Sequence, residues 1–445
     1  MIAASRVTVI GGGLAGCEAA FQLGKRGIDV DLWEMRPGRA TEAHKTDRLA
    51  ELVCSNSSRD DSTRTAVGLL KDEMRALDSL VMRVADRVCV PAGSALAVDR
   101  VAFAEGVESE IAAIGRIRVV REEAVDVPAG GVTIVASGPL TSEPLCESLT
   151  ELLGCGRLYF YDAISPIVTA TSIDMDIAFR AARYGRGGDD YINCPLDEEQ
   201  YGRLVTEISA AEKMPAKSFE RCLYFEGCMP VEELARRGRL TLAFGPMKPV
   251  GLVDPRSRTR PFAVVQLRQD DRAGSLYGMV GFQTKMTYPE QRRVFRMIPG
   301  LGGAEFVRLG SLHRNTFIDS PRCMTKALTV RGRNDLFVGG QLVGVEGYVE
   351  SAATGLLCGI NASRVARGQQ PVCPPSTTAL GALAAYVTEP TRKHFQPMNA
   401  NYGLFPPLET RARGREKRLA LGQRANRHLH QWMAEAGLTD STRVF

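Results

Sequence analysis

Two of the eleven cysteines stand in settings where a thiol could act as a catalytic nucleophile. Cys228 comes just before Pro230, and the residues from Pro230 to Gly238 predict a short helix that proline opens and glycine ends. The dipole and the free amide groups at a helix N-terminus favour the thiolate form of a neighbouring thiol. Cys54 lies in a polar turn at 52–58. Packing as a small apolar side chain is the alternative for both, and it is our interpretation of the other nine cysteines.

One histidine and one run of basic residues could bind a ligand without reacting with it. His313, within the polar cluster 312–316, could stack on or hydrogen-bond a heteroaromatic ring, although a structural histidine is an equal alternative. Residues 411–427 hold seven basic side chains and one acidic side chain. Such a run is either a solvated face or a surface that contacts a phosphate backbone. The candidate phosphate contacts are Arg411, Arg413, Arg415, Lys417 and Arg418.

A glycine-rich turn near the N-terminus, between a short apolar strand and a helix of small residues, is typical of dinucleotide binding. Gly11 permits the tight turn, Gly13 allows the backbone to approach a pyrophosphate, and Gly16 lets the helix pack closely on the strand. Glu34 ends the second predicted strand, eighteen residues after Gly16, and can accept hydrogen bonds from ribose hydroxyls. The alternative is a glycine-rich turn without a ligand. The predicted contacts are Gly11, Gly12, Gly13, Leu14, Ala15, Gly16 and Glu34.

Two later segments favour FAD over a nicotinamide as the resident dinucleotide. Residues 132–139 have the pattern of a buried strand with a small-residue turn at its end, as in FAD proteins with two dinucleotide folds. Residues 336–340 predict another strand and glycine turn, and a helix is predicted at 351–357. A helix N-terminus at the flavin pyrimidine ring would stabilise negative charge on the reduced cofactor, and a tightly packed helix without that role is the alternative. The further FAD contacts are Gly138, Gly340 and Gly347.

The composition excludes several classes of protein. With 44% hydrophobic and 24% charged residues, the chain has the balance of a soluble globular protein. No apolar run approaches the roughly 18 residues of a membrane-spanning helix, and the N-terminus lacks the pattern of a secretory signal. The cysteines are scattered and odd in number, without a C-x-x-C pair, so we expect no disulfide framework, no zinc site and a cytoplasmic protein. The net charge of +5 is compatible with a polyanionic partner.

The predicted elements indicate an α/β protein with a Rossmann-like FAD-binding domain of the two-dinucleotide-fold type, split by an inserted α+β domain. The first part of the FAD-binding domain is expected at 1–160 and the inserted substrate domain at 161–325. The second part is expected at 326–445, with a basic helical tail. The sequence leaves the oligomeric state open, and a monomer is compatible with it.

Seven segments along the chain carry motifs of one enzyme family: GGGLAGCEAA at 11–20, EMRP at 34–37, ELVCSNS at 51–57, the loop 244–254, HRNT at 313–316, GVEGY at 344–348 and FQPMNAN at 395–401. They resemble the folate- and FAD-dependent tRNA uracil-5-methyltransferases known as TrmFO, over essentially the whole chain. The opening motif is also similar to that of the GidA-like flavoproteins, which modify the wobble uridine of tRNA.

The resemblance implies a specific reaction. TrmFO enzymes take a one-carbon unit from 5,10-methylenetetrahydrofolate and electrons from NAD(P)H through FAD, and they methylate C5 of the T-loop uridine (position 54) of tRNA. A thiolate that adds at C6 of uracil makes C5 nucleophilic. By motif match, Cys228 resembles this nucleophile and Cys54 resembles a second cysteine near the flavin. His313 and Tyr348 match the positions that sandwich the pterin against the flavin ring. Cys222, six residues before Cys228, departs from the motif.

Three alternatives remain open at this stage. A homologous enzyme could methylate a uridine of ribosomal RNA, and purified tRNA and rRNA substrates would separate the two. A GidA-like enzyme could modify the wobble uridine, but that family is much longer and needs a helical C-terminal domain that we do not find in these 445 residues. A flavin-holding RNA-binding module without turnover would reduce its flavin with NADPH and form no product.

Overall fold

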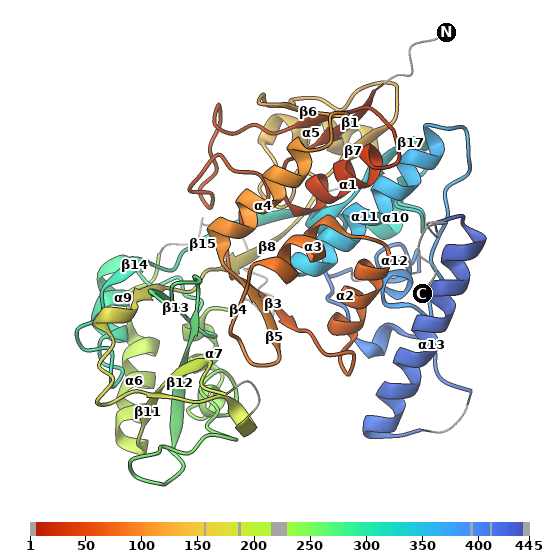
Figure 1. Ribbon diagram of the computed structural model, residues 1–445. Helices are drawn as coiled ribbons and strands as arrows, with labels where there is room; N and C mark the ends of the chain where they lie inside the picture. Colours follow the sequence, from red (N-terminus) through yellow and green to blue (C-terminus); the bar gives the residue numbers. More distant parts are fainter. Residues whose placement is uncertain are drawn as a thin grey trace.

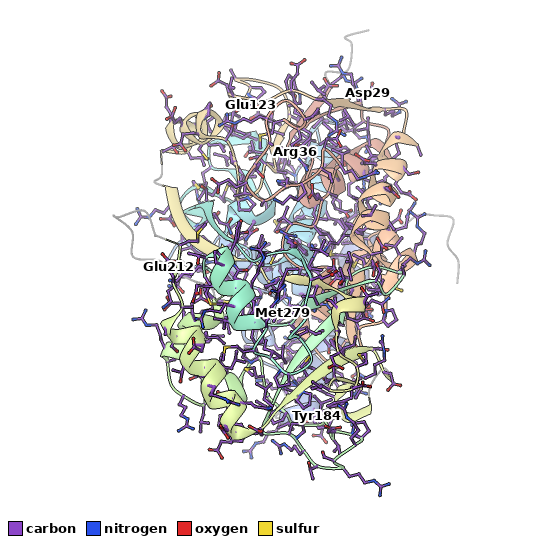
Figure 2. The ribbon with its side chains drawn as sticks, turned by 90° about the vertical axis from the view of Figure 1, so that its left-hand side faces the viewer. Asp29, Arg36, Glu123, Tyr184, Glu212 and Met279 are labelled. Atoms are coloured by element: carbon purple, nitrogen blue, oxygen red, sulfur yellow. The ribbon has the colours of Figure 1, made fainter. Side chains whose placement is uncertain are left out.

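Two six-stranded sheets organise the protein, whose computed structural model describes residues 6–154, 157–185, 188–214, 229–391, 395–409 and 412–438 (Figure 1). One sheet lies in the upper unit of Figure 1, while the other lies in the lower left unit. In the view turned by 90°, Arg36 and Glu123 belong to the upper unit, and Met279 and Tyr184 to the lower one (Figure 2).

The first sheet is the parallel sheet that the glycine-rich turn requires. Its strand order is β16-β17-β7-β1-β2-β6, and only the β16–β17 pair is antiparallel. The central strands β1 and β7 are short apolar runs that are largely buried, as in other parallel sheets, whereas the edge strand β6 is partly exposed. The strands are β1 (Val7–Ile10), β2 (Val30–Trp33), β6 (Ile117–Val120), β7 (Thr133–Val135), β16 (Thr329–Val330) and β17 (Arg333–Val338).

Two helices of small residues, α1 (Leu14–Gly24) and α11 (Tyr348–Val365), pack against each other on this sheet. Their backbones approach closely, because a Cβ at Gly355 would lie 2.2 Å from the Ala15 carbonyl oxygen. A Cβ at Gly359 would lie 2.7 Å from the Ala19 carbonyl oxygen. The small residues in both helices therefore bring the N-terminus of α11 next to the glycine-rich turn, although α11 begins only at residue 348.

The second sheet is antiparallel and has its own hydrophobic core. Its strand order is β10-β11-β12-β13-β9-β14. The strands are β9 (Ile167–Thr169), β10 (Phe179–Arg180), β11 (Tyr191–Leu196), β12 (Ala263–Gln269), β13 (Leu276–Met279) and β14 (Phe306–Arg308). The helices of this unit are α6 (Glu198–Ala210), α7 (Val231–Arg236), α8 (Thr241–Phe244) and α9 (Tyr288–Phe295).

A two-stranded antiparallel pair, β8 (Arg157–Ala163) with β15 (Leu312–Ile318), joins the two units. The expected boundary at residue 160 falls within β8, and the boundary at 325 follows β15. The separate cores of the two sheets support the expected division into a split FAD-binding domain and an insertion, which stays our proposal.

The remaining elements cover the first unit. A small sheet of β3 (Ser57–Asp60), β5 (Ala95–Val98) and β4 (Cys89–Val90) reaches toward the insertion. The helices α12 and α13 lie beside α2 at the right of Figure 1. The helices are α2 (Ala66–Ala76), α3 (Leu80–Arg87), α4 (Arg100–Ala112), α5 (Glu143–Leu153), α10 (Ser320–Cys323), α12 (Ala379–Val387) and α13 (Gly414–Glu435).

Candidate active site

The glycine-rich turn leaves room for a ligand where it meets α1. Gly11 has a φ of +108°, and a Cβ there would lie 2.5 Å from the Ala136 carbonyl oxygen. A Cβ at Gly16 would lie 1.8 Å from the Gly11 carbonyl oxygen, so close packing of β1, α1 and β7 requires glycine at both positions. At Gly13, by contrast, no chain atom comes within 4 Å of such a Cβ. Gly13 is the N-cap of α1, whose first turn lacks a side-chain cap and an acidic residue, so its amides suit a phosphate group.

Glu34 lies beside this turn and is held as a carboxylate. Its Oε2 accepts a hydrogen bond from the Gly12 amide at 3.1 Å, and its Oε1 accepts two from Arg36, at 3.0 Å from the backbone N and 2.9 Å from Nε. Burial raises the pKa of Glu34, but the hydrogen bonds and charge of Arg36 outweigh it, and the pKa lies below its usual value. Each carboxylate oxygen can accept two hydrogen bonds, so Oε2 can also accept one from a ribose hydroxyl.

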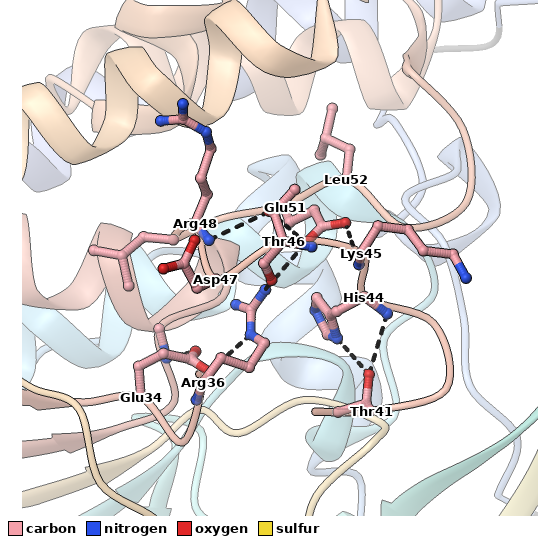
Figure 3. Close-up of polar contacts among 12 residues, drawn as sticks. Glu34, Arg36, Thr41, His44, Lys45, Thr46, Asp47, Arg48, Glu51 and Leu52 are labelled. Carbon is pink, nitrogen blue, oxygen red and sulfur yellow. Dashed lines mark hydrogen bonds and ion pairs between the residues drawn. The ribbon is translucent and has the colours of Figure 1, made fainter. Parts of the chain in front are cut away.

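Arg36 ties Glu34 to the loop that follows β2. Its guanidinium donates to the Thr46 carbonyl oxygen at 3.0 Å and to Glu51 at 3.1 Å, as Figure 3 shows. In the same loop, Thr41 Oγ1 and His44 Nδ1 lie 2.6 Å apart. The buried Glu34–Arg36–Glu51 group therefore fixes the loop against the end of β2.

A pocket opens between this turn and the loop after β7. The loop 137–142 contributes Ser137 and Thr141 to its lining, opposite Glu34 and the glycines. Gly138 lies in the same loop, where its carbonyl accepts a hydrogen bond from Thr141 Oγ1 at 2.6 Å. A glycine turn, a ribose-binding carboxylate and an uncapped helix N-terminus around one pocket fit the adenosine diphosphate part of FAD.

The N-terminus of α11 carries the second group of predicted FAD contacts. The Gly340 amide donates to Thr354 Oγ1 at 2.8 Å. Gly347 is the N-cap of α11, and a Cβ there would lie 2.4 Å from Oε2 of Glu350. Glu350 is buried in the first turn of α11 and pairs with Arg59. The positive N-terminal end of α11 therefore also lies close to a buried carboxylate. Our sequence argument for flavin binding did not include this carboxylate.

Tyr348, the first residue of α11, binds the loop that holds Cys54. Its Oη accepts hydrogen bonds from the backbone N–H groups of Cys54, at 2.7 Å, and Ser55, at 3.2 Å. The Cys54 thiol lies 3.9 Å from the Ala163 carbonyl oxygen at the end of β8. Burial, together with the neighbouring Cys54, raises the pKa of Tyr348, so the hydroxyl stays neutral. Cys54 and Tyr348, which the resemblance gives separate roles, therefore share one site.

Arg100, the first residue of α4, holds the Cys54 loop by its carbonyl oxygens. Its guanidinium donates to Leu52 O at 2.6 Å and to Cys54 O at 3.1 Å. Its Nε donates to Asp270, at 2.8 Å, which belongs to the inserted unit. One side chain thus connects the loop to both units.

Two further arginines reach the same loop from strands of the insertion. Arg268 of β12 donates to Ser55 Oγ at 2.7 Å, and Arg308 of β14 donates to the Val53 carbonyl oxygen. Burial lowers the pKa of both side chains. Sequence reasoning missed these arginines. The available signal was a charged residue inside the otherwise apolar strand 263–269.

The strand pairing places the backbone of His313 near this loop. In β15, Leu312 lies opposite Ala163 and His313 lies opposite Asp162. Because the Cys54 thiol contacts Ala163, the backbone of His313 is one register position from that contact. Three of the four residues that the resemblance assigns to catalysis and folate binding are thus brought together.

The fourth, Cys228, lies outside the described residues. The helix predicted after it is α7, which has only six residues and carries Glu232 and Glu233 in its first turn. Glu232 is buried and accepts hydrogen bonds from Thr284 Oγ1, at 3.0 Å, and the Lys285 amide, at 2.6 Å. Two acidic side chains thus lie in the first turn of the helix that the sequence predicts, and the role of Cys228 stays a prediction.

The basic run of the sequence lies on α13. Arg413 is its N-cap, and Arg415, Lys417 and Arg418 are exposed in its first turns. Arg411 lies outside the described residues.

In the parts of the chain that the structure describes, no group of three or more His, Cys, Asp or Glu side chains could hold a metal ion. Within the same residues, no helix is both long and apolar enough to cross a membrane.

A family model described as "glucose inhibited division protein A" matches residues 6–370. Among solved structures, GidA of Aquifex aeolicus superposes with a TM-score of 0.71 over 98% of this chain and 74% of that chain, at 16% sequence identity. At this identity the likeness shows the fold alone. It confirms the expected α/β fold related to GidA-like flavoproteins.

Curated relatives match along nearly their whole length. The protein named methylenetetrahydrofolate–tRNA-(uracil-5-)-methyltransferase TrmFO from Geobacter sulfurreducens is 58% identical over 96% of this chain and 99% of its own. The TrmFO of Moorella thermoacetica is 56% identical over 93% of this chain and 94% of its own. The chain therefore belongs to the TrmFO family, within the wider group that the glucose inhibited division protein A model describes.

Proposed function

We propose that this protein methylates C5 of the T-loop uridine (position 54) of tRNA. The carbon donor is 5,10-methylenetetrahydrofolate, and FADH2, reduced by NAD(P)H, is the reductant. Folate-dependent methylation of uracil in tRNA is the activity in the names of relatives that are up to 58% identical. The observation that carries the proposal is the meeting of Cys54, Tyr348 and the N-terminus of α11 at one end of the dinucleotide-binding unit.

The residues of the first unit fit an FAD molecule, and we assign them its binding. The amides of the 11–16 turn would hold the pyrophosphate, and Glu34 would accept a hydrogen bond from the ribose. Gly138, Gly340 and Gly347 would contact the remaining parts of the cofactor. When bound and reduced, FAD supplies hydride equivalents.

Cys228 is the proposed nucleophile on the uracil ring. Its thiolate adds to C6, which places the displaced electron pair on C5 as an enolate. C5 then bonds to the methylene carbon of the folate. Loss of the C5 proton and cleavage of the bond between this carbon and the folate nitrogen release tetrahydrofolate and leave an exocyclic methylene group on C5. Two-electron reduction of this methylene carbon by one hydride equivalent and departure of the thiolate from C6 yield 5-methyluracil, with tetrahydrofolate as the other product.

Cys54 is the proposed second cysteine of the flavin site, and the contacts of Tyr348 limit what Tyr348 can do. Because its Oη already accepts from two backbone amides of the Cys54 loop, its ring rather than its hydroxyl is the part that can face a pterin. His313 is the proposed partner on the other side of the pterin. Arg100 and Arg308 hold the Cys54 loop in place for these contacts.

We assign tRNA binding to the exposed basic residues at the start of α13, and the cytoplasm as the place of action. The eight cysteines in the described ranges are free thiols, which suits a reducing compartment.

The function is tested by comparing RNA substrates and cysteine variants. We expect the purified protein to show a flavin absorbance spectrum and to form 5-methyluridine in unmodified tRNA, and not in tRNA whose T-loop uridine is replaced by cytidine. Cys228→Ala should keep FAD and lose methylation. Cys373→Ala removes an exposed thiol of the same chain and should keep both. Full activity of Cys228→Ala, or equal methylation of ribosomal RNA, would contradict the proposal.

A further inference from the structure

A large groove lies between α13 and the loop that leads from β3 to α2. Its volume is about 1030 Å³. The loop 60–65 forms one wall, with Ser94 of the neighbouring hairpin, and α13 forms the other. None of its lining residues belongs to the dinucleotide pocket. The groove is therefore a site separate from the one that the FAD contacts explain.

Four arginines line this groove: Arg64, Arg415, Arg418 and Arg427. All four side chains are exposed, and within the described ranges none has a carboxylate at ion-pair distance. Other exposed arginines of the chain, such as Arg116, have such partners. Unpaired guanidinium groups facing one concave surface indicate an anionic ligand.

Asp60 is the one acidic residue of the lining, and its hydrogen bonds turn it toward its own loop. Its Oδ1 accepts from the Ser62 amide at 2.8 Å, and its Oδ2 accepts from Ser94 Oγ at 2.9 Å. These hydrogen-bond donors of the groove wall stabilise the negative charge of Asp60. The groove as a whole stays positive.

The helix α13 is built to present these arginines. Its buried face has Leu421, Ala425 and Leu429, which recur at the four-residue spacing of one helix face. A second face, with the spacing of residues 415, 418, 422 and 426, borders the groove. Tyr402 Oη donates to the Thr63 carbonyl oxygen at 2.8 Å and fixes the opposite wall.

The position of these charges disfavours a purely structural role. Arg415 and Arg418 lie in the first two turns of α13, where the helix dipole is positive. A cation there is unfavourable for the helix, whereas an anion bound there is favoured. The amide side chains of Gln423 and Asn426 also line the groove, and the apolar Leu419 beside them is 59% exposed. A strand with phosphates, hydroxyl groups and flat bases matches this mixture.

We propose that this groove binds the sugar–phosphate backbone of the RNA substrate, next to the segment that enters the active site. The inference rests on the proposed function, because it takes the RNA to be the one that is methylated. The arginines contact phosphates, while Gln423 and Asn426 contact ribose hydroxyls or base edges. Arg64 extends this surface beyond the basic run at 411–427, and Lys417 of that run is not among the residues that line the groove.

The groove lies within reach of the active site along β3. Six residues separate Cys54 from Asp60. An extended chain of that length spans at most about 22 Å, since each residue adds about 3.3–3.6 Å. At a rise of about 3.4 Å per stacked nucleotide, about six nucleotides cover that distance. One arm of an RNA can therefore place a uridine near Cys54 while its backbone lies in the groove.

The test compares two exposed arginines. Arg418 lines the groove, whereas Arg116, which precedes β6 in the first unit, does not. We expect Arg418→Ala to weaken binding of an unmodified tRNA transcript about tenfold and to reduce the salt dependence of its Kd by about one counterion, with Arg116→Ala close to wild type. The combined variant Arg415→Ala, Arg418→Ala, Arg427→Ala should lose further affinity. Flavin absorbance and the unfolding temperature are measured for each variant and should not change.

Several results would overturn the proposed RNA-binding groove or the proposed function. Equal losses of affinity for Arg418→Ala and Arg116→Ala would overturn the groove and leave only a diffuse charge effect. Wild-type affinity of the triple variant would also overturn it, and so would equal binding of poly-glutamate, which would indicate an acidic protein partner. If the wild-type protein binds tRNA through the groove but forms no 5-methyluridine, the proposed function fails while the groove stands.

Discussion

The backbone N–H of Cys54 donates a hydrogen bond to Oη of Tyr348 at 2.7 Å, across 294 residues of sequence. This bond joins the loop that holds Cys54 to the first residue of α11. Because the same hydroxyl accepts from Ser55, one phenol fixes two consecutive amides of the loop. The position of the Cys54 thiol relative to the flavin-binding unit therefore depends on Tyr348.

Replacing Tyr348 by phenylalanine should reduce the initial rate of methylation by more than the loss of unfolding free energy explains. The change leaves two partly buried amides without their acceptor, which costs about 1–3 kcal/mol of unfolding free energy. Tyr201→Phe is the control, since it removes a buried hydroxyl of the inserted unit that donates to Arg239 O at 2.7 Å and accepts from the Ala243 amide at 3.2 Å. Urea unfolding and initial rates are measured for both. Equal loss of activity in the two variants would show that Tyr348 acts through stability alone.

Replacing Gly13 or Gly16 of the glycine-rich turn by alanine should affect the protein in two different ways. Gly13→Ala adds a Cβ with no chain atom within 4 Å, so the protein should fold normally and lose FAD, because the methyl group enters the ligand space. Gly16→Ala forces a Cβ against the Gly11 carbonyl oxygen and should cost about 1–3 kcal/mol or more of stability. Gly115→Ala, also in open space, is the control. Flavin content and thermal unfolding are the measurements, and full flavin content in Gly13→Ala would contradict the assignment.

The buried ion group at Glu34 should make Arg36 essential for the nucleotide-binding loop. Arg36→Ala leaves the buried Glu34 and the half-buried Glu51 without their cation, at a cost of about 3–5 kcal/mol. Arg39→Ala removes a more exposed pair with Glu123, for which a cost of about 0–1 kcal/mol is expected. Chemical denaturation and FAD retention are compared. A cost for Arg36→Ala no larger than that for Arg39→Ala would contradict the role of the buried group.

Glu73 should make the stability of the protein depend on pH. This fully buried carboxyl accepts from the amides of Ala379 and Leu380 at the start of α12, and burial raises its pKa from 4.5 to about 8. A raised pKa means that the folded protein binds the proton more tightly than the unfolded chain does. The contribution is therefore fully present below about pH 4.5 and lost as the pH rises toward about 8.

Unfolding free energies between pH 5 and pH 8 test this dependence, with Glu73→Gln as the variant that cannot titrate. The wild type should lose more stability across this range than Glu73→Gln. Identical slopes for the two proteins would assign the pH dependence to other groups.

The sequence was most informative where the determinants are local. The strand, glycine turn, helix and Glu34 follow one another within 34 residues, and the structure forms them as predicted. The fold class followed from the same repeated pattern of short buried strands. The contact of Cys54 with Tyr348 could not be predicted from spacing, because it depends on how α11 packs on α1.

The same holds for groups that only tertiary packing brings together. Arg268 and Arg308 are single charges in separate strands of the insertion, and nothing in their local sequence connects them to residue 54. The groove along α13 combines a charge run that the sequence does reveal with Arg64, which lies 350 residues earlier than Gly414. The helix predicted after Pro230 forms at Val231–Arg236, while the role of Cys228 stays a prediction.

The most direct test of the account follows the carbon atom. The purified protein is incubated with unmodified tRNA, NADPH and 5,10-methylenetetrahydrofolate that carries an isotope label in its methylene carbon. The tRNA is then digested and its nucleosides are analysed by mass spectrometry. We predict one labelled carbon in 5-methyluridine, none without NADPH, and none with Cys228→Ala. Unlabelled 5-methyluridine formed from S-adenosylmethionine, or a protein that carries no flavin, would contradict the account.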